Sequence, residues 1–227
     1  MKNIVVLTGA GISAESGLKT FRDSDGLWEG HAIEDVATPG AWRRNPKLVL
    51  DFYNMRRRDV AAAIPNEAHV AVADLERDHE VTVITQNVDD LHERAGSSKV
   101  MHLHGEIFKM RSDRDQTVTF PVYEDMVLGA QASDGGFLRP AIVWFEEPVP
   151  MIELAASIVA EADIFILVGS SLQVYPAAGL LHYVPRHAPI YIVDKKIPEV
   201  APRPRLHLFE KPATAGMLDV LSAIRLG

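Results

Sequence analysis

The chain of 227 residues is 47% hydrophobic and 24% charged, a composition typical of a soluble globular domain. Its formal charge of -8 argues against a nucleic-acid partner, and the absence of cysteine excludes disulfides, thiolate metal sites and a cysteine nucleophile. No apolar run approaches the ~20 residues of a membrane span and no signal-peptide profile is present, so we expect a cytoplasmic protein without a membrane partner.

A glycine-rich turn follows the first predicted strand. The apolar run 4–7 is typical of a buried strand, and Gly9 and Gly11 come directly after it. Glycines there permit a tight turn and the approach of a phosphate, while Ser13 and Glu15 stand where a helix should begin. Strand, glycine turn and helix start together predict a dinucleotide site, although a turn and a cap without any ligand fit the same pattern.

The segment after this turn argues against a hydride-transferring dehydrogenase. Such an enzyme has a second strand that ends in an acidic residue about 20 residues beyond the glycines. Here residues 20–28 are polar and interrupted by glycine, as in a loop, and residues 34–42 show no strand pattern.

Helices and strands alternate along the rest of the chain. Helical spacing covers residues 45–63, Asn66 can cap a second helix, and further helices are predicted at 151–162 and near the C-terminus. Strands are predicted at residues 81–85, 164–168 and 190–193. Residues 105–138 have no clear pattern beyond a half-buried strand at 116–120.

This order predicts an α/β fold, with a doubly wound, Rossmann-like parallel sheet and a smaller inserted lobe. We expect one catalytic domain over residues 1–227. Its core would comprise about 1–30, 66–104 and 139–227, and its small lobe the helical segment 31–65 together with 105–138.

Small and amide side chains follow three of the predicted strands, at residues 9–13, 86–89 and 169–171. Ligands bind at the carboxyl ends of the strands in such sheets, so these segments predict a nucleotide site. The motifs at residues 9–17, 20–22, 85–89, 104–105 and 169–176 occur in the order found in sirtuins. From about residue 4 to residue 220, the chain resembles this family of NAD-dependent protein-lysine deacylases.

The resemblance implies an acyl transfer that consumes NAD. The acyl oxygen of a modified lysine attacks the nicotinamide-bearing ribose carbon, nicotinamide leaves, and the products include free lysine and 2′-O-acyl-ADP-ribose. His104 matches the family's base, a role that needs a pKa near neutrality, and Asn87 matches the residue that positions a water and the ribose hydroxyls. His92 and His102 are interpreted as surface or hydrogen-bonded core histidines.

The resemblance also implies a set of NAD contacts. Gln86, Asn87 and Asp89 would hold the nicotinamide and its ribose, although a polar helix cap fits Asn87 and Asp89 equally well. Phe21 would shield the reacting carbon from water. The cofactor residues expected are Gly9, Ala10, Gly11, Ser13, Glu15, Phe21, Arg22, Trp28, Gln86, Asn87, Asp89, Gly169, Ser170, Ser171, Asp194 and Ala213.

Acyl-lysine should bind beside Val143 and Phe145. By the resemblance, the Val143 carbonyl accepts the lysine amide hydrogen bond and Phe145 lines the acyl tunnel. The substrate backbone would add as a strand between this segment and residues 174–176. For Trp144, a core position and a site position remain equally open.

Tyr53 and Arg56 resemble the Tyr-x-x-Arg segment of sirtuins that remove succinyl and malonyl groups. Spaced three apart, they lie on one side of a helix, and a guanidinium with a phenolic hydroxyl can bind a carboxylate. Ala37 matches the small residue that widens this pocket. The alternative is a solvated basic helix face, to which we assign Arg57 and Arg58.

The chain departs from the family in four places, one of which is Asp194 in place of the usual asparagine that contacts the adenosine ribose. Most sirtuins carry four cysteines that bind a structural zinc, and without them we expect no metal site. Apolar packing would then hold the small lobe, through Phe108, Val118, Phe120, Val122, Tyr123 and Val127. Glu146 stands where the family usually has glycine, and Lys19 where proline or a small residue is common.

These observations predict an NAD-dependent protein-lysine deacylase that prefers succinyl- or malonyl-lysine over acetyl-lysine. Its partners would be acylated lysine side chains of proteins, and we expect a monomer. One alternative is mono-ADP-ribosyl transfer or NAD hydrolysis at the same site. Another is a catalytically weak sensor of NAD or ADP-ribose.

Overall fold

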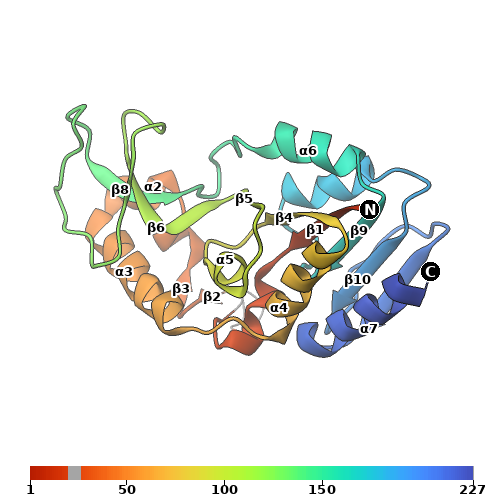
Figure 1. The fold of residues 1–227 in the computed structure, drawn as a ribbon. Coiled ribbons are helices and arrows are strands. Elements are labelled where there is room, and N and C mark those ends of the chain that lie inside the picture. The colour runs from red at the N-terminus through yellow and green to blue at the C-terminus, as the bar shows by residue number, and fades with distance from the viewer. Residues whose placement is uncertain (20–26, 227) are drawn as a thin grey trace.

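A six-stranded parallel sheet forms the centre of the computed structural model, which describes residues 1–19 and 27–226 (Figure 1). Every neighbouring pair of strands in it is parallel. The strands follow the order β11 (Leu206–Glu210), β10 (Ile190–Asp194), β9 (Ile164–Val168), β1 (Asn3–Thr8), β4 (Glu80–Thr85) and β5 (Val100–His102).

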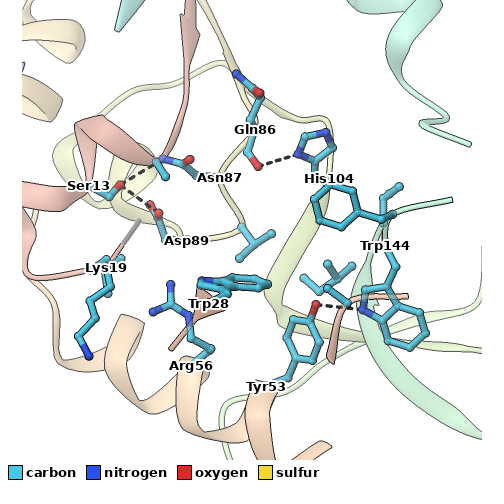
Figure 2. A pocket seen from close by; sticks show the side chains of 17 residues that line it. Ser13, Lys19, Trp28, Tyr53, Arg56, Gln86, Asn87, Asp89, His104 and Trp144 are labelled. Atoms are coloured by element: carbon cyan, nitrogen blue, oxygen red, sulfur yellow. Dashed lines mark hydrogen bonds between the residues drawn. The ribbon is translucent and has the colours of Figure 1, made fainter. Parts of the chain in front are cut away.

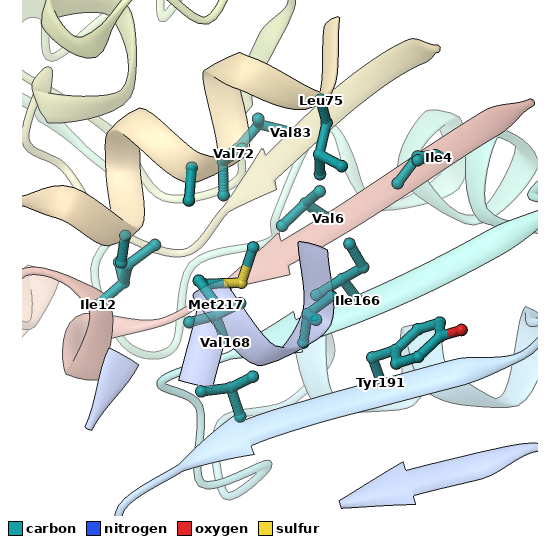
Figure 3. Close-up of a cluster of buried hydrophobic side chains, with 14 of the residues drawn as sticks. Ile4, Val6, Ile12, Val72, Leu75, Val83, Ile166, Val168, Tyr191 and Met217 are labelled. Atoms are coloured by element: carbon teal, nitrogen blue, oxygen red, sulfur yellow. The ribbon is translucent and has the colours of Figure 1, made fainter. Parts of the chain in front are cut away.

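Helices cover both faces of this sheet, because successive side chains of a strand point to opposite sides. Ile4 and Val6 of β1 pack with helices α4 (Glu67–Asp74) and α7 (Ala213–Leu226), in the cluster that Figure 3 shows. Val5 and Leu7 pack on the other side with α6 (Ile152–Ala160) and the 3-10 helix η4 (Ala177–Tyr183). The predicted doubly wound fold is confirmed.

A second, smaller lobe stands beside the main sheet, at the left of Figure 1. Its antiparallel sheet has the order β7 (Thr119–Pro121), β6 (Gly105–Ser112) and β8 (Leu138–Ile142). The helices α1 (Ile33–Val36), α2 (Pro39–Arg44) and α3 (Pro46–Ala62) complete it, with a short hairpin of β2 (Leu27–Trp28) and β3 (His31–Ala32).

Local sequence explains where the predicted helices begin. Asn45 accepts a hydrogen bond from the Leu48 amide and Pro46 occupies the first turn of α3, while Asn66 caps α4 through the Ala68 amide. The prediction of a helix after the glycine turn is wrong, however. Two 3-10 turns stand there, η1 (Ala10–Ile12) and η2 (Ala14–Ser16), and Gly17 ends them in the left-handed region with φ of 89°.

The interior of the second lobe differs from the predicted one. Val118, Phe120 and Val122 pack against its core, but Tyr123 and Val127 are 76% and 72% exposed. Hydrogen bonds between buried polar groups provide part of the stabilisation that was expected from apolar packing. Elements that the sequence did not predict include the strands β5, β6 and β11, the hairpin of β2 and β3, the helix α5 (Leu91–Ala95), and the 3-10 helices η3 (Leu75–Arg77) and η4.

Arg57 is 1% exposed, so its assignment to a solvated face is wrong. Its guanidinium donates to the carbonyls of Ile107 and Glu124 and to the Asn54 side chain. Asn54 in turn exchanges two hydrogen bonds with the backbone of Met126. Helix α3 thereby binds β6 and the 124–126 loop from inside the lobe. Arg58 is exposed and pairs with Asp125, as expected of a surface residue.

No helix among the described residues is long and apolar enough to cross a membrane.

Candidate functional site

A cavity of about 100 Å³ lies where the carboxyl ends of β1 and β4 meet the second lobe (Figure 2). Residues distant in sequence line it together. The predicted site residues among them are Ala10, Ser13, Trp28, Ala37, Tyr53, Arg56, Gln86, Asn87, Asp89, His104, Val143 and Phe145. Leu18, Lys19, Val88, Ile142 and Trp144 also line the cavity and were not predicted as site residues.

The glycine turn packs directly on the end of β9. A Cβ added to Gly9 would lie 2.7 Å from the Gly169 carbonyl oxygen, and one added to Gly11 only 2.6 Å from the Gly169 Cα. The Gly11 amide donates to the Gly169 carbonyl at 2.9 Å. This backbone contact alone explains why Gly9 and Gly11 are glycines, with no need for a bound phosphate. A side chain at either position would separate the two strand ends.

Ser13 connects the two polar residues that follow β4. Its hydroxyl donates to the Asp89 carboxylate at 3.0 Å and accepts from the Asn87 amide at 3.2 Å. The Asn87 amide also lies 3.2 Å from the Gly9 carbonyl. Burial raises the pKa of Asp89, partly offset by hydrogen bonds from the Leu91 amide and Ser13. These contacts fix the orientation of the Asn87 side chain at the cavity wall.

His104 lies at the cavity wall opposite Ser13 in Figure 2. Its Nδ1 is 2.9 Å from the Gln86 carbonyl, and since a carbonyl only accepts, Nδ1 carries the proton. Burial lowers the pKa of His104, although the Gln86 hydrogen bond opposes this. The ring is therefore neutral at pH 7, with the Nε2 lone pair available to accept a proton.

Tyr53 and Trp144 line the cavity where it borders the second lobe. The Trp144 indole N–H donates to the Tyr53 hydroxyl at 3.0 Å, and both residues are buried. Burial raises the pKa of Tyr53 despite this hydrogen bond, so the phenol keeps its proton. Beside them the Phe145 amide donates to the Ala37 carbonyl at 3.0 Å. Trp144 thus belongs to both the core and the site.

Arg56 has a carboxylate partner within its own chain. Its Nη1 lies 3.0 Å from Glu29, and the other oxygen of Glu29 lies 3.0 Å from Lys19 Nζ. The Arg56 side chain is 7% exposed, and its guanidinium carbon lies 5.4 Å from the centre of the Trp28 ring. Figure 2 shows Arg56 beside Trp28, while the Tyr53 hydroxyl points toward Trp144.

Glu147 organises the loop that carries Val143 and Phe145. Its carboxylate accepts from Arg139, from Arg111 and from the Trp144 backbone amide. Burial alone would raise the pKa of Glu147, but the hydrogen bonds and charges of these arginines outweigh it and lower the pKa. Its neighbour Glu146 is exposed, with φ of 72°, a conformation that favours glycine.

The other predicted cofactor residues that the structure describes do not line the cavity. Glu15 accepts from the amide and hydroxyl of Thr214 and so holds the start of α7. Ser170 accepts from the Gln86 side chain at 2.9 Å, next to Gly169 and Ser171 at the end of β9. Asp194 ends β10 and accepts from the Lys196 amide, and Ala213 is buried at the start of α7. Phe21 and Arg22 lie outside the described residues.

Comparisons with known proteins agree on one family. The sequence profile of the Sir2 family matches residues 9–176. An NAD-dependent protein deacylase of Helicobacter pylori is 51% identical over 221 residues, covering 97% of this chain and 96% of that protein. One of Bacteroides thetaiotaomicron is 52% identical over 226 residues, covering 97% of each.

Solved structures of Sir2 proteins share the fold as well. A Sir2 homolog in complex with NAD superposes with a TM-score of 0.88 at 38% identity, covering 99% of this chain and 90% of that one. A Sir2 protein with a p53 peptide and NAD+ gives a TM-score of 0.79 at 30% identity, covering 99% and 94%. The chain belongs to the Sir2 family.

Proposed function

We propose that this Sir2-family chain, an NAD-dependent protein deacylase, removes succinyl and malonyl groups from lysine in preference to acetyl groups. NAD and one water molecule are consumed: nicotinamide leaves the ribose carbon of NAD, the acyl group moves to the ADP-ribose product, and water supplies the oxygen and protons that release lysine as the free amine. The proposal rests above all on Arg56, a buried cation at the wall of the cavity that also contains His104.

His104 is suited to act as the base. The Gln86 carbonyl fixes the tautomer, and the lowered pKa keeps Nε2 unprotonated at neutral pH. A ribose hydroxyl placed at hydrogen-bond distance from Nε2 could therefore transfer its proton there. The adjoining Gly105 has φ of 82°, and a Cβ at this position would lie 2.0 Å from the Ala141 carbonyl oxygen. Only glycine permits that approach of β6 to β8 directly after His104.

Asn87 and Asp89 would bind the nicotinamide end of NAD. Both are almost completely buried and both line the cavity, which places polar atoms in its wall. Ser13 links them, so neither side chain can rotate without losing a hydrogen bond. Such prior orientation reduces the cost of aligning the ribose with His104.

The Val143 backbone could hold the acyl-lysine amide. Its N–H already donates to the His104 carbonyl at 2.9 Å, which fixes the peptide. Its carbonyl accepts no hydrogen bond from the part of the chain that the structure describes. Val143 also lines the cavity, so this acceptor is close to the place where the acyl group would enter.

The acyl end of the cavity offers donors for a carboxylate. Because the Tyr53 hydroxyl accepts from Trp144, its own proton remains available to donate. Lys19 and Arg56 are two cations that share the single carboxylate of Glu29, so these three groups carry a net positive charge. A succinyl or malonyl carboxylate would neutralise that charge, whereas an acetyl group would leave it unpaired.

The sensor alternative depended on Glu146 hindering the substrate. Glu146 is exposed and is absent from the residues that line the cavity, so its carboxylate leaves the acyl site open. The backbone conformation at this position is the one that the family's glycine would adopt, which keeps the loop shape needed for Val143 and Phe145.

The deciding experiment is a competition among peptides of one sequence that carry acetyl-, malonyl-, succinyl- or longer acyl-lysine, with and without NAD, resolved by mass. We expect NAD-dependent loss of the succinyl or malonyl group first. Faster loss of acetyl would overturn the acyl preference. Label transferred to protein, or free ADP-ribose without deacylation, would favour the transferase or hydrolase. NAD binding without nicotinamide release would favour the sensor.

A further inference from the structure

Two histidines bind successive carbonyls of the loop after β4. His104 Nδ1 lies 2.9 Å from the Gln86 carbonyl, and His102 Nδ1 lies 3.0 Å from the Asn87 carbonyl. Both rings must donate from Nδ1, because a carbonyl offers no proton. These two side-chain contacts therefore join the C-terminal end of β5 to the 86–87 loop.

The two rings differ in what their other nitrogen meets. His104 Nε2 has no described partner, whereas His102 Nε2 lies 2.7 Å from the Glu93 carboxylate of α5. A carboxylate also only accepts, so this contact requires a proton on Nε2 as well. With both nitrogens donating, His102 is an imidazolium held between Glu93 and the Asn87 carbonyl.

The surroundings of His102 support this protonation state. Burial would lower its pKa, but the hydrogen bond and charge of Glu93, the Asn87 carbonyl and the charge of Glu106 together raise it. Glu106 lies 4.0 Å from Nε2 and forms its own ion pair with Lys109. The charge of His102 also lowers the pKa of two nearby described groups, the Asp89 carboxylate and the His92 ring.

The backbone of Asn87 is thereby fixed on both sides of its Cα. Its N–H donates to the Thr85 hydroxyl at 3.0 Å, and its carbonyl accepts from His102. The side chain of the same residue lines the cavity and contacts Ser13. A displacement of the carbonyl would rotate this side chain away from the reacting ribose.

We propose that Glu93 and His102 form a carboxylate–imidazolium pair that positions Asn87 for the transfer reaction. The inference rests on the proposed function, in which Asn87 binds the reacting end of NAD. Neither Glu93 nor His102 lines the cavity, so both are positioning residues that act through the Asn87 peptide.

Three variants separate positioning from a general effect of charge. Glu93→Ala removes the contact, and we expect kcat to fall roughly ten- to one-hundred-fold, with an unchanged KM for the acyl peptide and an unchanged Tm. Glu106→Gln is the matched control, because it removes a carboxylate near the same ring without breaking a hydrogen bond. Its kcat should stay within about two-fold of wild type.

Glu93→Gln supplies a chemical rescue with a distinct signature. In wild type, kcat should fall as pH rises through the raised pKa of His102, because the neutral ring turns a lone pair toward the carboxylate. A glutamine amide can instead donate to that lone pair, so this variant should keep near-wild-type kcat and lose the alkaline decline.

The measurement is kcat and KM over a pH series for wild type and the three variants, together with Asn87→Ala. The proposal is overturned if Glu93→Ala behaves like Glu106→Gln, or if Glu93→Gln loses as much kcat as Glu93→Ala. Normal nicotinamide release by Asn87→Ala would instead overturn the role of Asn87 in the proposed function itself.

Discussion

Arg56 and Glu29 form an ion pair at the wall of the cavity, with 3.0 Å between Nη1 and Oε1. Both side chains are largely buried, at 7% and 12% exposure, so water screens the pair only weakly. Glu29 presents to Arg56 the same chemical group that a succinyl or malonyl chain would bring. If the substrate carries a carboxylate, as proposed, it would compete with this carboxylate of the protein, and Lys19 would offer the displaced Glu29 a second partner.

Glu29→Gln should improve desuccinylation. Without the competing charge, we expect KM for a succinyl peptide to fall about ten-fold, which corresponds to about 1.4 kcal/mol, while KM for an acetyl peptide stays constant. Steady-state kinetics on matched peptides measure this. Glu34→Gln, an exposed carboxylate of α1, is the control. A rise in KM for the succinyl peptide would mean that Glu29 orients Arg56 rather than competing for it.

Arg56→Met should separate the two acyl activities. Charge-assisted hydrogen bonds contribute about 1.5–3 kcal/mol each, so desuccinylation should fall at least roughly ten-fold while deacetylation changes by less than about three-fold. Arg58→Met is the matched control, because Arg58 lies two residues further along α3, is exposed and pairs with Asp125. Equal losses of both activities in Arg56→Met would remove the argument for a carboxylate clamp.

The pH dependence of kcat/KM should report His104. Its pKa is lowered from 6.5 by burial, and it must be neutral to accept a proton. Activity should therefore decline as pH falls through a midpoint below 6.5. A pH series on wild type measures the midpoint, and Glu93→Gln should leave this acid decline in place. An acid midpoint above that value would assign the base to another group.

Glu146→Gly should stabilise the protein. A non-glycine residue in the left-handed region costs about 1–2 kcal/mol, so removing the side chain should raise the free energy of unfolding by about 1 kcal/mol. Denaturant unfolding measures this, and deacylation should not decrease. Glu147→Gln is the contrasting change: it weakens the contacts with Arg111, Arg139 and the Trp144 amide and should lower stability. Destabilisation by Glu146→Gly would contradict the backbone argument.

The second lobe should depend on Arg57 and tolerate a chelator. Arg57→Met leaves the buried Ile107 carbonyl and the partly buried Glu124 carbonyl without that donor, which should cost about 2–4 kcal/mol of unfolding free energy. Arg58→Met should cost less than about 1 kcal/mol. EDTA should change neither Tm nor turnover of the pure protein. Loss of turnover with EDTA would show that a metal contributes after all.

The centre of the main sheet could be predicted because β1, β9 and β10 contain continuous apolar runs. Residues 164–168 are predicted as a strand and form one, since a strand covered on both faces leaves no polar position. The edge strand β11 was missed because its side chains are mostly exposed and no such run marks it. In the second lobe, the long strand β6 mixes glycine, charged and apolar residues, which hides its period.

Most of the cavity residues were predicted from short motifs, and those motifs carry most of the polar lining of the cavity. The contacts of these residues could not be predicted, because they join segments far apart in sequence. The Arg56–Glu29 pair spans 27 positions, and the Trp144–Tyr53 hydrogen bond spans 91. Arg57 was misassigned for the same reason: its neighbours in sequence are arginines, and only the folded chain brings the Ile107 carbonyl to it.

The contacts of Arg57 also determine how the second lobe responds to oxidation and alkylation. Its donors bind oxygen atoms, and none of the 227 residues is a cysteine. Peroxide or an alkylating agent therefore has no thiol in this lobe to modify. Methionine is the only sulfur-containing residue that can be oxidised. Met126 is 7% exposed and is bound through its backbone, so oxidation would spare the contact that Asn54 makes. The contacts that Arg57 and Asn54 make in the second lobe should therefore persist under oxidation.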